Sequence, residues 1–325
     1  MGLLRIAAAL LLLASTAFGQ TLQVSDFRCG RTNTIQIVDG QPGAVVLFTL
    51  HLHRPPTQTP ETRISIQRFN ADGCAVFKIP LSANSQAQNW NLIARSSSDL
   101  RSFTVLQAAG PVLPATIIPH HPASDSFDGN QLHPSWSLLH PALMDYEVSG
   151  GALHITPTQT GPLATWVSDN EGPFIYKTVH GDFDVQSTVH AESALTPGTQ
   201  VPIRFRLGGL IARNPNSAPG SRSSAHVVLG GGNANYPIAV EDKTTYSSTS
   251  DWFFQAIPSM DLDLRITRVG DLISRMYRIP GRPMWTVIRA DQHPEFGPTA
   301  QVGMMAYSFD APADIHVWFD QIIFY

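Results

Sequence analysis

The chain has 325 residues, of which 43% are hydrophobic and only 14% are charged, and its formal net charge at pH 7 is −4. The hydrophobic share is enough to bury a core, which excludes an intrinsically disordered polymer. The acidic balance excludes a nucleic-acid binder that relies on phosphate contacts, because such a protein needs a basic face, and it argues against binding an anionic membrane surface. The length allows about two domains.

Residues 1–19 have the three-part layout of a secretory signal peptide. Arg5 supplies the positive charge, residues 6–14 form an unbroken apolar run, and Ala17-Phe18-Gly19 places small residues before a cleavage site at Gln20. The apolar run is too short to span a bilayer, which takes about 20 apolar residues. We therefore expect an exported protein, secreted or periplasmic, with no membrane span. Removing the leader leaves 20 basic against 25 acidic residues.

The two cysteines, Cys29 and Cys74, both lie in the first third of the chain. In an oxidising compartment two cysteines of one domain most often pair, so the sequence predicts a disulfide between them. The alternative is a pair of buried free thiols. Neither cysteine has a C-x-x-C partner, which disfavours a metal site.

Residues 20–109 read as a small β-sandwich domain. Apolar segments are short, and residues 63–69 alternate apolar and polar side chains at period 2, as a half-buried strand does. Turn-forming residues such as Asp39-Gly40 separate these segments. Residues 110–123 carry four prolines and are predicted to be a stiff linker.

The same strand pattern continues over residues 124–325. Residues 182–192 place Phe183, Val185, Ser187 and Val189 on one face of a predicted strand. Alternating apolar residues around Leu264, followed by Gly270-Asp271, predict a two-residue β-hairpin. No window shows a sustained helical period, so few helices are expected.

An ordered series of short motifs runs through this second region. It comprises Asp125-Ser126-Phe127-Asp128-Gly129, Gly172-Pro173-Phe174-Ile175-Tyr176-Lys177, Gly181-Asp182-Phe183-Asp184-Val185, Gly208-Gly209-Leu210-Ile211-Ala212-Arg213, Ser250-Asp251-Trp252, Trp285-Thr286-Val287-Ile288-Arg289 and Val317-Trp318-Phe319-Asp320. In this order the motifs resemble the DUF1349-type domains of the concanavalin A-like lectin/glucanase superfamily, which are related to the C-terminal modules of some β-xylosidases.

The resemblance implies an all-β protein in which a small N-terminal β-sandwich precedes a concanavalin A-like antiparallel jelly roll. It also implies a concave sheet of the kind that carries sugar-binding or catalytic residues in that superfamily. Many of these sandwiches hold a structural calcium ion near the chain ends, and Asp125, Asp128 and Asp320 are the candidate oxygen ligands here. Ordinary turn chemistry is the alternative for Asp128-Gly129.

No catalytic residues are evident. Glucanases of this fold supply two carboxylates from one strand as E-x-D-x-E, because alternate residues share a face, and this motif is absent. The pairs Asp182/Asp184 and Asp261/Asp263 share a face, but each opens a predicted strand beside apolar residues and is interpreted as a solvated edge.

Sugar sites combine an aromatic or apolar wall with a few polar groups. The candidate ligand-binding residues of this kind are Arg213, Trp252, His226, Lys177 and Arg289. A salt bridge with a nearby Asp is the alternative for Arg213, and a loop anchor on the sandwich rim is the alternative for Trp252. Trp136, Trp285 and Trp318 lie in apolar, strand-like settings and are predicted to be core residues.

The sequence thus favours a secreted carbohydrate-binding protein without evident catalytic residues, whose partner is a glycan or polysaccharide. One alternative is an extracellular protein-interaction or adhesion module, which would present a flat apolar patch. The other is a glycoside hydrolase with atypical catalytic groups, which would bury two acids, at least one with a raised pKa.

Overall fold

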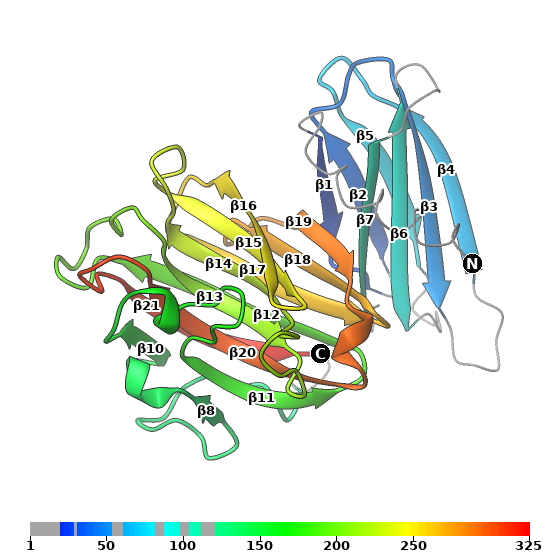
Figure 1. Cartoon of the computed structure of the whole chain (residues 1–325). Helices are drawn as coiled ribbons and strands as arrows, with labels where there is room; N and C mark the ends of the chain where they lie inside the picture. The colour runs from blue at the N-terminus through cyan, green and yellow to red at the C-terminus, as the bar shows by residue number, and fades with distance from the viewer. Residues whose placement is uncertain (1–19, 29–30, 54–60, 82–87, 98–103, 112–120) are drawn as a thin grey trace. The chain divides into compact units, whose positions relative to one another are not determined.

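The computed structural model describes residues 20–28, 31–53, 61–81, 88–97, 104–111 and 121–325. They form β-strands joined by turns and three single-turn 3-10 helices, Pro141–Leu143, Pro162–Ala164 and Pro294–Phe296. The predicted all-β, antiparallel class is therefore confirmed. No helix among these residues is long and apolar enough to cross a membrane. The chain divides into two compact units, the first formed by residues up to 117 with Pro283–Ala290, and the second by the rest (Figure 1).

The first unit contains strands of two sheets, in the orders β5-β2-β1-β19 and β4-β3-β6-β7. Their strands are β1 Thr21–Ser25, β2 Thr32–Val38, β3 Val45–His53, β4 Glu61–Arg68, β5 Ala75–Pro80, β6 Asn89–Ser97, β7 Thr104–Pro111 and β19 Met284–Gln292. β3 buries every second residue, Val46, Phe48, Leu50 and Leu52. This alternation is expected for a strand of a β-sandwich that has one face in the core and one face toward solvent.

The chain returns to the first unit through β19, which pairs antiparallel with β1. Trp285 of β19 lies opposite Val24 and is fully buried. Its indole Nε1 donates a hydrogen bond of 2.9 Å to Asp26 Oδ1. The predicted core role of Trp285 is thus confirmed, but this side chain completes the core of the first unit.

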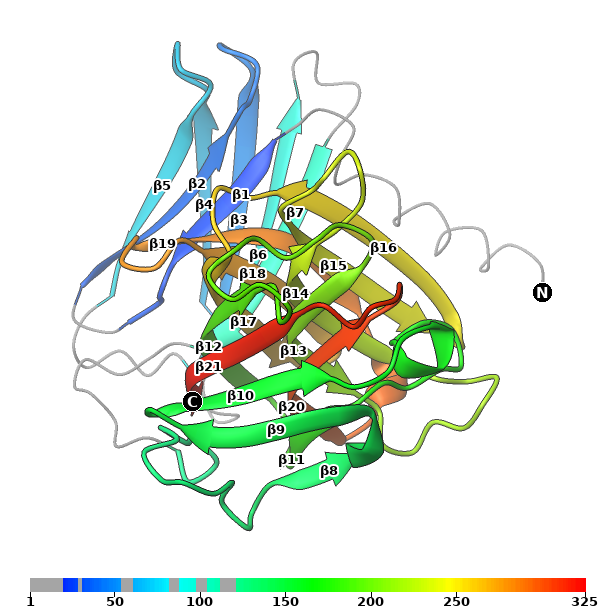
Figure 2. The same cartoon turned by 90° about the vertical axis from the view of Figure 1, so that its left-hand side faces the viewer.

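The second unit is a sandwich of two larger antiparallel sheets, whose layers are visible from the side in Figure 2. One has the order β18-β17-β12-β21-β10-β9, and the other has the order β16-β15-β14-β13-β20-β11-β8. The strands are β8 Ser137–Leu139, β9 Met144–Ser149, β10 Ala152–Pro157, β11 Phe174–His180, β12 Phe183–Glu192, β13 Arg206–Arg213, β14 Ser224–Gly231, β15 Ala239–Tyr246, β16 Thr249–Ala256, β17 Asp261–Val269, β18 Leu272–Arg278, β20 Thr299–Ser308 and β21 His316–Phe324.

The predicted strand and hairpin of this unit are present. β12 buries Phe183, Val185, Ser187 and Val189 on one face, and β17 joins β18 with Val269 opposite Leu272, as a two-residue turn requires. The expectation of a solvated edge is wrong for Asp184. Its carboxylate is fully buried and accepts two hydrogen bonds from Arg265, at 2.8 and 2.6 Å.

Of the two remaining tryptophans predicted as core, Trp136 is buried beside Phe127, whereas Trp318 is not. Trp318 lies on the β21 face opposite the buried Val317 and Phe319 and is only half-buried. Its ring stacks on His190 with centroids 5.0 Å apart. The prediction failed because both faces of β21 carry large apolar or aromatic side chains, so composition alone could not assign the inner one.

The predicted Cys29–Cys74 disulfide is not formed, because Cys74 has a free thiol. Cys29 itself lies outside the described residues.

The first two residues of the predicted linker, Gly110 and Pro111, belong to a strand. β7 continues through Pro111, which lies opposite Asn89 on β6. Pro111 lies on β7, an edge strand of its sheet, where its missing N–H is tolerated. Residues 112–120 of the predicted linker lie outside the described residues.

Candidate ligand-binding face

Three of the five predicted ligand-binding residues lie on one face of the second unit. The strand register places His226 of β14 opposite Lys243 of β15, and Lys243 opposite Trp252 of β16. Arg213 lies two residues after Ile211, which is opposite His226, and therefore shares this face. We call the side of β13–β16 that carries His226, Lys243 and Trp252 the tryptophan face.

The tryptophan face points away from the other sheet of the sandwich. Asp242, whose side chain lies on the opposite side of β15 from Lys243, ion-pairs with Arg275 of β18 in the facing sheet. Glu241 and Lys243 flank Asp242 in the strand, so both project from the outer side of β15. On this side Ile211, Val228 and Phe254 are buried in an apolar cluster with Trp166, whereas Trp252 is exposed.

A buried polar cluster lies within the tryptophan face, centred on Glu241 Oε1. This oxygen accepts hydrogen bonds from His226 Nε2 at 2.9 Å and from the Tyr307 hydroxyl at 2.8 Å, and Lys243 Nζ lies 3.0 Å away. Glu241 and His226 are fully buried. Among the described residues, Glu241 Oε2 and His226 Nδ1 have no hydrogen-bond partner. The cluster thus retains acceptor capacity that buried polar groups normally fill.

The charges of this cluster follow from its contacts. Burial opposes ionisation of Glu241, but the Lys243 ammonium and the His226 hydrogen bond outweigh it and lower the carboxyl pKa to about 2. Burial lowers the pKa of His226 to about 4, despite the hydrogen bond to Glu241. Burial likewise raises the pKa of the Tyr307 hydroxyl, with Glu241 adding to the effect. Near neutral pH the cluster therefore holds one carboxylate beside a neutral imidazole and a neutral phenol.

Trp252 lies at the solvent side of this cluster. It belongs to the middle of β16 rather than to a loop, so the expected loop position is wrong, and it is 47% exposed. Lys243 Nζ lies 5.7 Å from the centre of the Trp252 ring and 5.5 Å from the centre of the Tyr307 ring. The ammonium is thus held between an exposed and a buried aromatic ring, an arrangement that fixes the indole by cation–π attraction.

Arg213 forms an ion pair with Glu171. It is buried at the end of β13, with Nη1 2.6 Å from Glu171 Oε1, and Arg222 Nη2 lies 3.1 Å from the other oxygen of Glu171. Burial lowers the pKa of Arg213, and Glu171 opposes that shift. The structural alternative for Arg213 is thus present, with a glutamate as the partner in place of the expected Asp.

The other two predicted residues lie elsewhere. Arg289 is on β19, in the first unit. Lys177 is buried on β11 beside Trp136, away from the tryptophan face.

The three aspartates proposed as calcium ligands do not form a cluster. Asp125 accepts hydrogen bonds from Phe127 N at 2.9 Å and from Trp136 Nε1 at 2.8 Å. Asp128 accepts one from Ser126 Oγ at 2.6 Å, and Asp320 Oδ2 lies 3.1 Å from His190 Nε2. No group of three or more His, Cys, Asp or Glu that could hold a metal occurs among the described residues. Calcium binding stays an expectation from the resemblance.

Sequence reasoning missed Glu241, Lys243 and Tyr307. The segment 239–246 contains five polar or charged residues in a row and lacks the period-2 apolar alternation that predicts a strand. Had β15 been predicted, the spacing of Glu241 and Lys243 would have placed both on one face.

No protein-family model and no curated protein matches this chain. Among solved structures it is similar to a functionally unknown protein from Saccharomyces cerevisiae, with 14% identity over 59% of this chain and 96% of that one, and a TM-score of 0.44. The GH43 protein BlXynB from Bacillus licheniformis shows 12% identity over 90% of this chain and a TM-score of 0.49, and the chain spans 62% of its length. A legume lectin-like domain from Entamoeba histolytica shows 8% identity over 59% of this chain and 89% of that one, and a TM-score of 0.40. At these levels of identity and TM-score, the similarities carry no argument about function.

Proposed function

We propose that this chain is an exported carbohydrate-binding protein of the DUF1349 type, and that its second unit binds neutral glycans on the tryptophan face. The observation that carries the proposal is the position of Trp252, half exposed in the middle of a strand and adjoining the Lys243 ammonium. An exposed indole face stacks on the C–H surface of a pyranose ring, while neighbouring polar groups bond to the hydroxyls.

The buried cluster does not supply the general acid of glycoside hydrolysis. A general acid in glycoside hydrolysis needs a carboxyl group that is protonated near working pH. Glu241 has the opposite property, since its pKa is lowered to about 2 and it stays a carboxylate. In the proposal Glu241 acts as a positioning residue, which holds the Lys243 ammonium beside the indole ring.

The test is a glycan array with the full mature chain, followed by affinity measurement for any neutral glycan that is bound. Trp252→Ala should weaken binding by about tenfold, the loss expected when a contact worth somewhat more than 1 kcal/mol is removed. Tyr246→Ala is the matched control, because Tyr246 is 52% exposed at the end of the same hairpin. Absence of any bound glycan would refute the function, and equal affinities of wild type and Trp252→Ala would refute the site.

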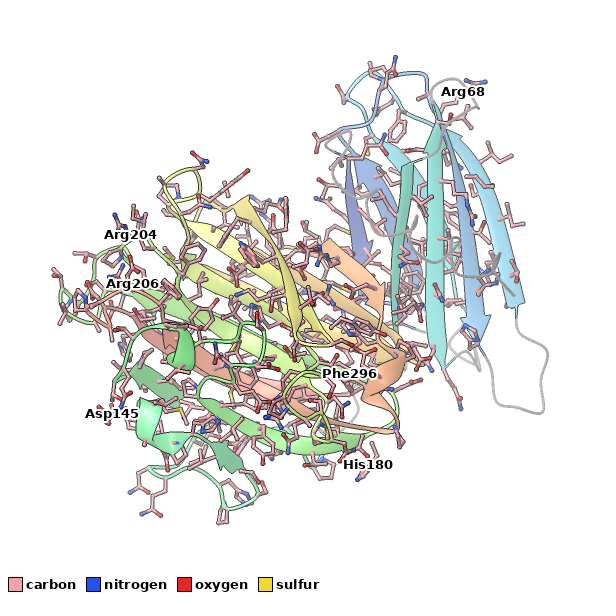
Figure 3. The ribbon with its side chains drawn as sticks, viewed as in Figure 1. Arg68, Asp145, His180, Arg204, Arg206 and Phe296 are labelled. Carbon is pink, nitrogen blue, oxygen red and sulfur yellow. The ribbon has the colours of Figure 1, made fainter. Side chains whose placement is uncertain are left out.

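A protein partner for the first unit is a second candidate function, favoured by Ile64 and Ile66. These side chains are 65% and 69% exposed on β4, which lies at the edge of its sheet. Arg68, labelled at the end of β4 in Figure 3, and Arg95, which lies opposite Leu47 on the same outer face, are the charged neighbours. The outward-facing residues described on β3, β4, β6 and β7 include no carboxylate. An apolar, acidic strand is therefore the partner that this edge suits.

A synthetic peptide of alternating valine and glutamate tests this second candidate by fluorescence anisotropy. Ile64→Thr/Ile66→Thr keeps strand-forming residues and should abolish binding, and a valine–lysine peptide should not bind wild type. Equal binding of both peptides, or unchanged binding by the double variant, would exclude this docking mode.

A further inference from the structure

A cavity of about 310 Å³ lies where the chain enters the second unit. Residues 122–126 form one wall and run beside β21, because Asp125 exchanges backbone hydrogen bonds with Ile322 and Ser124 Oγ accepts one from Phe324 N. The polar lining includes Asp125, His133 and Lys177, and Ile323 contributes an apolar wall. The volume is at the lower end of the range of small-molecule sites, about 300–1,000 Å³.

Lys177 places a buried positive charge at this cavity. The residue is only 8% exposed, and its Nζ lies 4.5 Å from the centre of the Trp136 ring. The described residues give this ammonium no hydrogen-bond acceptor, although it carries three N–H donors. Burial lowers the pKa of Lys177, and the nearby Asp125 charge opposes the shift. Lys177 Nζ is not among the fully enclosed polar atoms that lack a partner, so its unused donors are open to a ligand in the cavity.

Asp125 does not accept a hydrogen bond from the Lys177 ammonium. Both of its oxygens already accept hydrogen bonds from protein donors, Oδ1 from Phe127 N and Oδ2 from Trp136 Nε1. The bond to Nε1 fixes the Trp136 ring beside Lys177. Because both oxygens of Asp125 are already hydrogen-bonded, this carboxylate attracts the Lys177 ammonium less strongly.

His133 supplies a second donor. Its Nδ1 accepts a hydrogen bond from Ser135 N at 3.2 Å, so in the neutral ring the proton resides on Nε2. An ammonium and an imidazole N–H thus line one cavity, and both are donors to a carboxylate.

From this geometry we propose that the Lys177 cavity binds a small hydroxylated carboxylate of hexuronic acid size, with the carboxylate on Lys177 and His133. The cavity is separate from the tryptophan face, and the ligand class differs from the neutral glycans proposed there. The inference therefore does not depend on the function of Trp252.

Sodium glucuronate is the probe, glucose is its neutral match, and binding is measured by titration calorimetry on the full mature chain. Glucuronate should bind at least about tenfold more tightly than glucose, the ratio expected for a hydrogen bond to a charged group. Lys177→Met should lose that preference, and Lys177→Arg should retain part of it. Lys78→Met is the control, because Lys78 is exposed on β5. Trp252→Ala should leave glucuronate binding unchanged, which separates this site from the glycan site.

A second measurement on the wild-type chain avoids dependence on the folding of variants. The sequence has three lysines, Lys78, Lys177 and Lys243. Saturating glucuronate should slow acylation of Lys177 by acetic anhydride severalfold, relative to Lys78, as followed by peptide mass spectrometry. Equal binding of glucose and glucuronate, unchanged binding by Lys177→Met, or absence of protection at Lys177 would each overturn the proposal.

Discussion

Individual buried groups on the tryptophan face depend on one another for their charge. Glu241 is ionised at full burial because Lys243, His226 and Tyr307 all direct donors or positive charge at the same oxygen. Removing one partner of a buried ion pair leaves the other charge buried and unpaired. The resulting loss of folding free energy is larger than the stabilisation that the intact pair provides. Arg213 is unsuitable as a binding probe for the same reason, since Arg213→Ala would leave Glu171 beside Arg222 alone.

The burial of His226 predicts a loss of stability in acid. Its folded pKa is about 4, whereas an unfolded histidine titrates near 6.5. Between these values the unfolded chain takes up a proton that the folded chain does not, so the free energy of unfolding decreases as pH falls from about 6.5 to about 4. The contribution of this one group is roughly 3 kcal/mol over the full interval.

Urea unfolding at a series of pH values, with wild type and His226→Gln, measures this effect. Glutamine retains a donor for Glu241 but does not titrate, so wild type should lose stability more steeply than the variant below pH 6.5. His190 and His293, whose pKa values are raised, are common to both proteins and cancel in the difference. His180→Gln changes an exposed histidine of β11 and should follow the wild-type curve. Parallel curves for wild type and His226→Gln would contradict the prediction.

Individual strands could be predicted where local chemistry determines them. β12 alternates cleanly, and the turn between β17 and β18 contains Gly270, which adopts the positive φ of +60°. The β15–β16 hairpin was missed because its turn residues, Ser247 and Ser248, adopt positive φ without glycine or asparagine. As a result Trp252 was assigned to a loop, although it lies within a strand.

The candidate site was only partly predictable for a related reason. His226 and Trp252 could be chosen by residue type, but the groups that set their environment come from register. Lys243 meets both residues because β15 lies between β14 and β16. Lys177 and Arg289 were grouped with them by residue type alone, and the fold places them on β11 and β19.

At the scale of the whole molecule, the first unit depends on β19, a strand that is distant from it in the sequence. β1 has only five residues, and its edges are covered by β2 and by β19, which comes more than 250 residues later. Trp285 fills the core of the first unit from that distant strand. Residues 20–117 alone would therefore lack the buried Trp285 indole and its hydrogen bond to Asp26, and would expose the β1 edge.

A fragment of residues 20–117 should consequently be much less stable than the first unit of the full chain, and it should self-associate through its open edge. Adding a peptide of residues 283–292 in trans should restore a cooperative melting transition and a monomer–peptide complex, followed by circular dichroism and analytical ultracentrifugation. The same peptide with Trp285→Ala keeps the strand but removes the indole, so it should restore little stability, since replacing a buried tryptophan with alanine costs about 3–5 kcal/mol. If the fragment alone is a monomer that melts at the same temperature with and without the peptide, then β19 is dispensable and the first unit is complete within residues 20–117.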